Sequence, residues 1–157
     1  MTLFMLNLAL AIVWQIVTGT FGVGGLLAGF AVGYAVLWVG RPMFGDSPYF
    51  GKLWRIVGFF FYFLKELIMS SLRVAYDVVT PPIHARPGVI KVPIDAKTDL
   101  EITLLANLIT LTPGTLTLDV APDRKSLYVH AMFIDDPEKV RAGIKNGMER
   151  HLLELMR

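Results

Sequence analysis

The residues that decide the fold are the first forty, MTLFMLNLALAIVWQIVTGTFGVGGLLAGFAVGYAVLWVG (residues 1–40), which contain no charged side chain. All 15 Lys and Arg residues and all 13 Asp and Glu residues follow, from Arg41 onward. A single helix needs about 20 apolar residues to cross the hydrocarbon core of a bilayer. An uncharged block of roughly twice that length therefore predicts a transmembrane hairpin of two helices.

Two apolar runs make up this block, and a cluster of glycines separates them. Residues 3–18 predict the first helix and residues 26–39 the second. Between them a tight reversal is expected at four glycines, which accept positive φ and weaken helix continuity: Gly19, Gly22, Gly24 and Gly25. In the second helix, Gly29 and Gly33 have the G-x-x-x-G spacing that lets another helix approach closely in lipid. They are candidates for subunit packing, although glycine is also common in membrane helices without such a role.

The overall composition excludes several classes of function. The chain has no cysteine, which excludes disulfides and thiolate-ligated metals or clusters. Its formal net charge is only +2 and its basic residues are dispersed, which argues against a nucleic-acid partner. Hydrophobic residues make up 54% of the chain and are concentrated at one end. This distribution favours a membrane part joined to a small water-facing part.

The central segment, residues 41–80, is predicted to contain a connector and one long helix. Arg41 and Pro42 are expected to end the hairpin, and MFGDSPYFG (residues 43–51) is typical of a turn-rich connector. Residues 52–79 then predict a helix rich in Phe. When each residue is stepped by about 100°, the polar side chains fall within about 140° of one face: Lys52, Arg55, Tyr62, Lys65, Glu66, Ser70, Arg73 and Asp77.

Two interpretations of this long helix remain open. As a third transmembrane helix it would bury Lys65 and Glu66 near the middle of the bilayer, at a cost of a few kcal/mol per charge unless protein groups receive them. As an interfacial helix it would lay its apolar face into lipid and turn its charged face toward water or a partner subunit. Basic residues both precede and follow the helix, which favours the interfacial interpretation, with everything after Arg41 in the cytoplasm.

Residues 81–157 predict a small cytoplasmic α+β domain with the order βαββα. The prolines after residue 80 end the helical region. Strands are expected at residues 89–94, 115–120 and 127–134, with a hairpin turn at residues 121–126. The middle strand is expected to carry three apolar side chains on one face, namely Leu116, Leu118 and Val120.

Both helices of this domain have recognisable starts. Thr98 and Glu101 form a capping box at the first, which the sequence T-P-G at residues 112–114 is expected to end. Asp136 and Pro137 are expected to cap the second. Its apolar residues recur every four positions: Val140, Ile144, Met148 and Leu152.

No catalytic or metal-binding constellation can be assembled from the sequence. The three histidines, at positions 84, 130 and 151, share no metal-ligand spacing, and no nucleophile-elbow, phosphate-loop or dinucleotide motif occurs. We therefore expect neither enzyme activity nor a cofactor. Lys65 and Glu66 are the only charged pair inside a strongly apolar stretch, which makes them functional candidates. The predicted hairpin has no ionisable residue, so it cannot by itself relay protons or bind a bare cation.

Two segments carry a resemblance to a known family. LLANLITLTPGT (residues 104–115) and LYVHAM (residues 127–132) resemble the signature of the E subunit of the multisubunit Mrp/Mnh-type Na⁺/H⁺ antiporters. The resemblance covers essentially the whole chain, including KEL at residues 65–67 and RPG at residues 86–88. It marks five positions as signature residues with a structural role: Asn107, Thr112, Pro113, Gly114 and His130.

The resemblance implies an accessory subunit in a bacterial or archaeal cell membrane. Its partners would be the lipid membrane and the other antiporter subunits, and the large subunits would exchange Na⁺, or K⁺ in some relatives, for H⁺. The small subunit would then supply packing surface and assembly, with five candidate contact residues: Gly29, Gly33, Lys65, Glu66 and Arg73. The alternative hypothesis is a stand-alone, membrane-tethered binding module whose α+β domain receives a soluble ligand.

Overall fold

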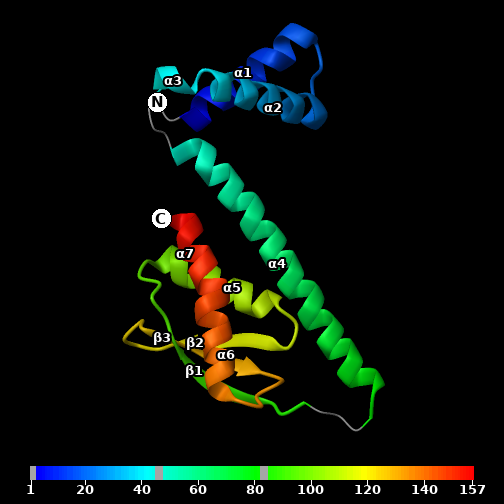
Figure 1. Ribbon diagram of the computed structural model, residues 1–157, viewed down its shortest axis with the longest axis vertical. Coiled ribbons are helices and arrows are strands. Elements are labelled where there is room, and N and C mark those ends of the chain that lie inside the picture. The colour runs from blue at the N-terminus through cyan, green and yellow to red at the C-terminus, as the bar shows by residue number, and fades with distance from the viewer. Residues whose placement is uncertain (1–2, 45–47, 82–84) are drawn as a thin grey trace. The chain divides into compact units, whose positions relative to one another are not determined.

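The computed structural model describes residues 3–44, 48–81 and 85–157. The chain divides into two compact units, Met1–Trp54 and Arg55–Arg157, and helix α4 (Pro48–Val79) contains the boundary between them (Figure 1). Each unit is described by itself.

A pair of packed helices, α1 (Leu3–Thr18) and α2 (Val23–Val39), forms most of the first unit (blue in Figure 1). Helix α1 has the predicted bounds, whereas α2 begins at Val23 rather than at residue 26. Gly19 and Gly22, with φ of 66° and 130°, make the reversal in the backbone region that favours glycine. The other two glycines of the predicted turn belong instead to the first turn of α2.

A short helix, α3 (Arg41–Phe44), follows where the sequence predicts a connector. Helix α2 does end here, at Val39 with Gly40 as its C-cap, but Pro42 does not stop the helical conformation. It lies in the first turn of α3, where a backbone N–H has no helical partner and proline is tolerated. The remaining connector residues, 45–47, lie outside the described residues.

Helix α4 begins at Pro48 rather than at residue 52. Its first turn packs within the first unit, where Phe50 is buried and its ring meets that of Tyr34 on α2 edge-on, with centroids 5.5 Å apart. Proline is favoured at the first position of a helix, and this aromatic contact holds the added turn in place.

The part of α4 that belongs to the second unit is amphipathic. Apolar side chains at helical spacing are exposed along one face: Val57, Phe60, Phe61, Leu64, Ile68, Leu72 and Val79. Within residues 3–44, 48–81 and 85–157, the structure contains no helix that combines the length and the apolar character needed to cross a membrane. The two spans expected in residues 1–40 stay a prediction.

A three-stranded antiparallel sheet forms the centre of the second unit. Its strands are β1 (Gly88–Pro93), β2 (Thr115–Val120) and β3 (Ser126–Ala131), in the order β1-β3-β2. Strand β3 ends three residues earlier than expected. Beyond it, the Met132 amide donates to the carbonyl of Gly114 and the Ile134 amide to that of Arg86, so the chain pairs with residues that precede the strands. The predicted combination of helices with a small sheet is confirmed.

One face of the sheet is covered by helix α5 (Asp99–Leu111) and by the C-terminal helical segment (Figure 1). That segment consists of α6 (Pro137–Gly143), a π-helical turn η1 (Ile144–Glu149) and α7 (Arg150–Met156). The core between the layers is aliphatic and includes Ile90, Val92, Leu105, Ile109, Leu127, Val129, Ile144 and Leu152. Burial of these side chains is the main stabilising term of the second unit.

The π-helical turn follows from the spacing of the apolar residues. In an α-helix of 3.6 residues per turn, a stripe that repeats every four residues drifts by about 40° at each step. The wider turn of η1 offsets this drift. As a result Ile144, Met148 and Leu152 are all buried against the same core.

Both predicted helix caps are present. The Glu101 amide donates to Thr98 Oγ1 at 3.2 Å, while Glu101 Oε2 accepts from the amides of Lys97 and Thr98 at 2.7 and 3.1 Å. These two amides, aided by Arg157, lower the pKa of the Glu101 carboxyl to about 2. At the other helix, Asp136 Oδ1 accepts from the Glu138 amide at 2.9 Å.

The other face of the sheet carries the exposed side chains of Leu116 and Leu118. The expectation that Val120 shares their face is wrong, because the register of β2 against β3 shifts between Thr117 and Asp119. This β-bulge turns Val120 toward the helices, where it packs against the core.

Candidate functional site

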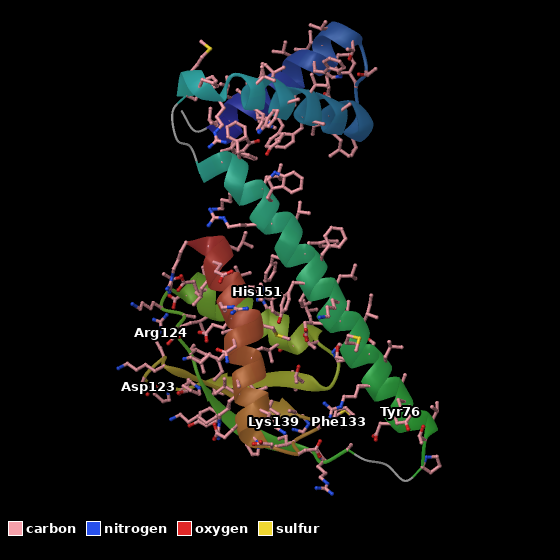
Figure 2. The ribbon with its side chains drawn as sticks, in the orientation of Figure 1. Tyr76, Asp123, Arg124, Phe133, Lys139 and His151 are labelled. Carbon is pink, nitrogen blue, oxygen red and sulfur yellow. The ribbon has the colours of Figure 1, made fainter. Side chains whose placement is uncertain are left out.

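A cleft of about 370 Å³ in the second unit brings together half of the residues singled out from the sequence as contact or signature positions. One wall is the polar face of α4, the opposite wall is α6 with η1, and the floor is the corner between α5 and β2. Its lining includes Glu66, Arg73, Thr112, Pro113, Gly114 and Lys139. Figure 2 labels Lys139 of α6 and Phe133, which also lines the cleft.

The wall that α4 contributes is held by short-range contacts. Ser70 Oγ donates to the Glu66 carbonyl at 2.7 Å, and the Glu66 side chain is half-buried. Further along, the guanidinium carbon of Arg73 lies 4.3 Å from the centroid of the Phe133 ring, and its Nη2 is 3.5 Å from Asp135 Oδ2. The last pair is exposed on both sides and contributes at most about 1 kcal/mol. Lys65 is exposed and does not line the cleft.

The floor of the cleft is the T-P-G corner. Helix α5 ends at Leu111, and Gly114 has a φ of 88°, which an L side chain rarely adopts. Thr112 Oγ1 donates to the Leu108 carbonyl at 2.9 Å and Thr115 Oγ1 to the Ile109 carbonyl at 2.6 Å. These bonds satisfy carbonyls at the helix end. The T-P-G corner thus shapes the end of α5 and faces the cleft, while a structural role for the signature as a whole stays a prediction.

Beside the cleft, α4 is anchored to the C-terminal segment by an aromatic contact. The ring of Tyr62 stacks on the imidazole of His151, which Figure 2 labels, and His151 Nδ1 lies 2.8 Å from the Gly147 carbonyl oxygen. A Cβ atom at Gly147 would lie 2.6 Å from Tyr62 Oη. A larger residue at this position would push the hydroxyl end of the tyrosine aside.

Two signature residues lie outside the cleft. Asn107 is exposed on α5. His130 is half-buried on β3, paired with Val89 on one side and Leu116 on the other, in the sheet face that the helices leave uncovered. The structure therefore does not bring these two residues together with the T-P-G corner.

In the first unit, the G-x-x-x-G pair lies where α1 contacts α2. A Cβ atom at Gly29 would be 2.8 Å from the Ala11 carbonyl oxygen, and one at Gly33 would collide with Asn7 Oδ1. Asn7 is fully buried, and its Nδ2 donates to Tyr49 Oη at 2.7 Å. Both glycines thus pack the hairpin itself, and their role toward another subunit stays a prediction.

A buried carboxylate was not anticipated from the sequence. Glu149, at the end of η1, is 1% exposed; its Oε1 accepts from the amides of Asp95 and Ala96, the second at 2.9 Å. Burial raises the pKa of this carboxyl, and the two amides and Lys145 oppose the shift. The role of Gly147 was not anticipated either. The sequence did offer one indication of it, because an isolated glycine inside a helical pattern often has a packing reason.

The described residues show no cluster of three or more acidic or histidine side chains with the arrangement of a metal site. What the geometry offers is a cleft with an apolar floor and charged rim, next to a helix with an exposed apolar face. Such features are typical of contacts between subunits.

Comparison with known proteins gives one consistent family. The sequence profile described as "Na+/H+ ion antiporter subunit" matches residues 7–155. The E subunit of the Na⁺/H⁺ antiporter of Alkalihalophilus pseudofirmus is 36% identical, over 96% of each chain. Its counterpart from Bacillus subtilis is 37% identical, over 98% of this chain and 97% of the relative.

Solved structures agree with this result. A chain of the Mrp complex from a Dietzia species is 34% identical and superposes with a TM-score of 0.51, covering 66% of this chain and 96% of that one. A chain of the membrane-bound sulfane sulfur reductase, an archaeal respiratory membrane complex, is 25% identical with a TM-score of 0.58, covering 96% of both. The chain therefore belongs to the family of Na⁺/H⁺ antiporter E subunits.

Proposed function

We propose that this chain is an accessory subunit of a multisubunit Na⁺/H⁺ antiporter, with a role in assembly rather than in ion translocation. The observation that carries the proposal is the near full-length similarity to named antiporter E subunits. Its partners are the other subunits of the antiporter. The reaction that the complex performs, exchange of Na⁺ for H⁺, is then carried out by those partners.

The hairpin is proposed to anchor the chain in the membrane. Helices α1 and α2 contain no Asp, Glu, Lys, Arg or His and expose large apolar side chains, such as Ile16, Val17 and Leu27. Helix α1 has 16 residues, about 24 Å at 1.5 Å per residue, which is shorter than a typical hydrocarbon core of about 30 Å. Local thinning of the bilayer or contact with neighbouring subunits would accommodate the difference.

Helix α4 is proposed to lie at the membrane surface rather than to cross it. Its polar side contacts the α+β domain from Arg55, whose Nη1 donates to the Glu154 carbonyl at 3.0 Å, to Val74, which lies beside Gly114. These contacts extend over about 28 Å of the helix. A crossing helix would draw the charged domain into the hydrocarbon, where each charge costs several kcal/mol. The exposed apolar face is free to enter lipid or to meet a partner.

Single cysteines in this cysteine-free chain test the proposed topology. We would place them at Phe21 between α1 and α2, at Lys52 and at Asp123 in the β-hairpin, all of which are exposed. With a membrane-impermeant maleimide, Phe21→Cys is expected to react from one side and the other two from the opposite side. Reaction of Lys52→Cys and Asp123→Cys from different sides would instead establish α4 as a third span.

The assembly role is tested by separating complex yield from transport. We would combine Lys65→Ala with Glu66→Gln and measure both the amount of purified complex and Na⁺/H⁺ exchange per complex in vesicles. An accessory role in assembly predicts a changed yield and unaltered exchange per complex. A lower exchange rate in a complex of normal yield would place these charges on the transport path.

A further inference from the structure

The cleft beside α4 is not filled by any described part of the chain itself. We propose that it receives an extended segment of a neighbouring antiporter subunit, which inserts an apolar side chain onto the floor. A basic side chain of that segment would face Glu66 and an acidic one would face Lys139. This inference rests on the proposed function, because it names the chemistry of the contact that holds this chain in the complex.

The charges of the rim carry the first part of the argument. Arg73 and Asp135 pair with each other at 3.5 Å, whereas Glu66 and Lys139 have no ion pair within the described parts of the chain. Glu66 is half-buried on the α4 wall of the cleft. Two unpaired charges of opposite sign on facing walls are complementary to a segment that carries both.

The floor and the walls define what can fit between these charges. Apolar side chains of Ile109, Val140, Ile144 and Met148 line the cleft between the rims. Gly143 on the α6 wall has no atom within 4 Å of where a Cβ would stand, which leaves open space for the backbone of a partner. A volume of about 370 Å³ is in the range of small-ligand cavities. It holds a few side chains and is too small for a whole helix.

The position of the cleft on α4 argues for a protein segment rather than for lipid. Stepping each residue by about 100° puts Tyr62, Glu66 and Arg73 roughly opposite the exposed stripe that contains Leu64 and Ile68. The exposed apolar stripe of α4 is the surface suited to contact with lipid acyl chains. The cleft faces away from it and combines an apolar floor with charges of both signs, as interfaces between subunits do.

A substitution that fills the cleft with a large side chain tests directly whether a partner segment binds there. Gly143→Trp projects a large side chain into open space, and Gly143→Ala is the matched control that adds only a methyl group. We expect Gly143→Trp to reduce co-purification with the other subunits about tenfold, as for loss of one strong interface contact, and Gly143→Ala to leave it unchanged. Equal co-purification of Gly143→Trp and wild type would overturn the proposal.

A photo-crosslinking amino acid at Gly143, in the assembled complex, identifies the occupant. A crosslink to another antiporter subunit is expected, and Glu66→Lys should reduce its yield. A complex that co-purifies normally but gives crosslinks only within the chain, or none, contradicts the cleft proposal and leaves the assembly role intact. Failure of the wild-type chain to co-purify with any antiporter subunit would instead contradict the proposed function.

Discussion

Tyr62 of α4 and His151 of α7 stack nearly parallel, with ring centroids 4.0 Å apart and an interplanar angle of 12°. The two residues are far apart in the sequence, and their contact ties the long helix to the last helix of the chain. Beside the stack, Gly147 keeps the space that the tyrosine hydroxyl needs. The stack thus joins α4 to the C-terminal segment beside the cleft, which Tyr62 also lines.

Gly147→Ala is expected to release α4 locally. The added Cβ would lie 2.6 Å from Tyr62 Oη, so the hydroxyl end of the tyrosine must shift and its stack on the imidazole is disturbed. Amide hydrogen exchange of residues 55–74 should accelerate about tenfold, for a loss of roughly 1.4 kcal/mol. Gly143→Ala, which meets open space, should not change this exchange. Adding Tyr62→Phe removes the clashing oxygen and should partly restore protection; no difference between Gly147→Ala and wild type contradicts the assignment.

Enlarging the two glycines of the hairpin should separate α1 from α2. Gly29→Ala places a Cβ 2.8 Å from the Ala11 carbonyl oxygen, and Gly33→Ala meets Asn7. Each change is expected to cost about 1–3 kcal/mol, the usual cost of overpacking, and to lower the thermal midpoint of the protein in detergent. Gly24→Ala, on the same helix but with nothing within 4 Å, serves as the control. Equal midpoints for all three variants would show that the helices do not pack as described.

Glu149 should make the fold less stable as the pH rises. Burial raises the pKa of its carboxyl above the usual 4.5. A group with a higher pKa in the folded chain than in the unfolded chain stabilises the fold fully below its unfolded pKa. This contribution is lost as the pH rises through the folded value. The stabilising contribution of Glu149 is therefore lost at pH values above 4.5. Thermal midpoints measured across this pH range test the effect.

Two substitutions separate the charge of Glu149 from its hydrogen bonds. Glu149→Gln keeps an acceptor for the amides of Asp95 and Ala96 and cannot titrate, so its midpoint should vary less with pH in this window. Glu149→Ala leaves the buried amide of Ala96 unpaired and should cost about 1–3 kcal/mol. An unchanged pH dependence in Glu149→Gln would rule out Glu149 as its source.

Glu101 should act in the opposite direction. Its folded pKa of about 2 lies below the usual 4.5, so its stabilising contribution is present above 4.5 and is lost as the pH falls toward 2. Glu101→Gln is expected to flatten the acid limb of the stability profile. Faster amide exchange at Lys97 and Thr98, whose N–H groups bond to the carboxylate, would accompany the loss. An acid limb identical to that of wild type contradicts this prediction.

Local signals in the sequence were sufficient for most of the secondary structure. The capping box of Thr98 and Glu101, the Asp136 cap and the glycine reversal after Thr18 depend on residues within a few positions of each other. The failures have longer-range causes. The bulge that turns Val120 inward depends on the register against β3, and the start of α4 depends on how Phe50 packs on Tyr34.

Only some of the residues that line the cleft could be predicted from the sequence. Glu66, Arg73 and the T-P-G corner were singled out, but no local pattern predicts that Lys139 lines the same cleft, because that depends on the packing of α6 on the sheet. Burial of Glu149 is similar: its amide partners lie in the loop after β1, and a glutamate on a C-terminal helix is ordinarily solvated.

The π-helical turn gives the C-terminal segment one residue more than a continuous α-helix would place between α6 and α7. Its first half is registered on the sheet through Ile144, and the helix beyond it presents His151 to α4. In a regular α-helical turn, removing one residue would turn everything beyond it by about 100°. A π-helical turn pairs i with i+5 rather than i+4, so removing one residue between 144 and 149 would instead let the segment close as a continuous α-helix. His151 would then still face α4, and this turn is the place in the C-terminal segment where a residue can be lost without uncoupling the domain from the long helix.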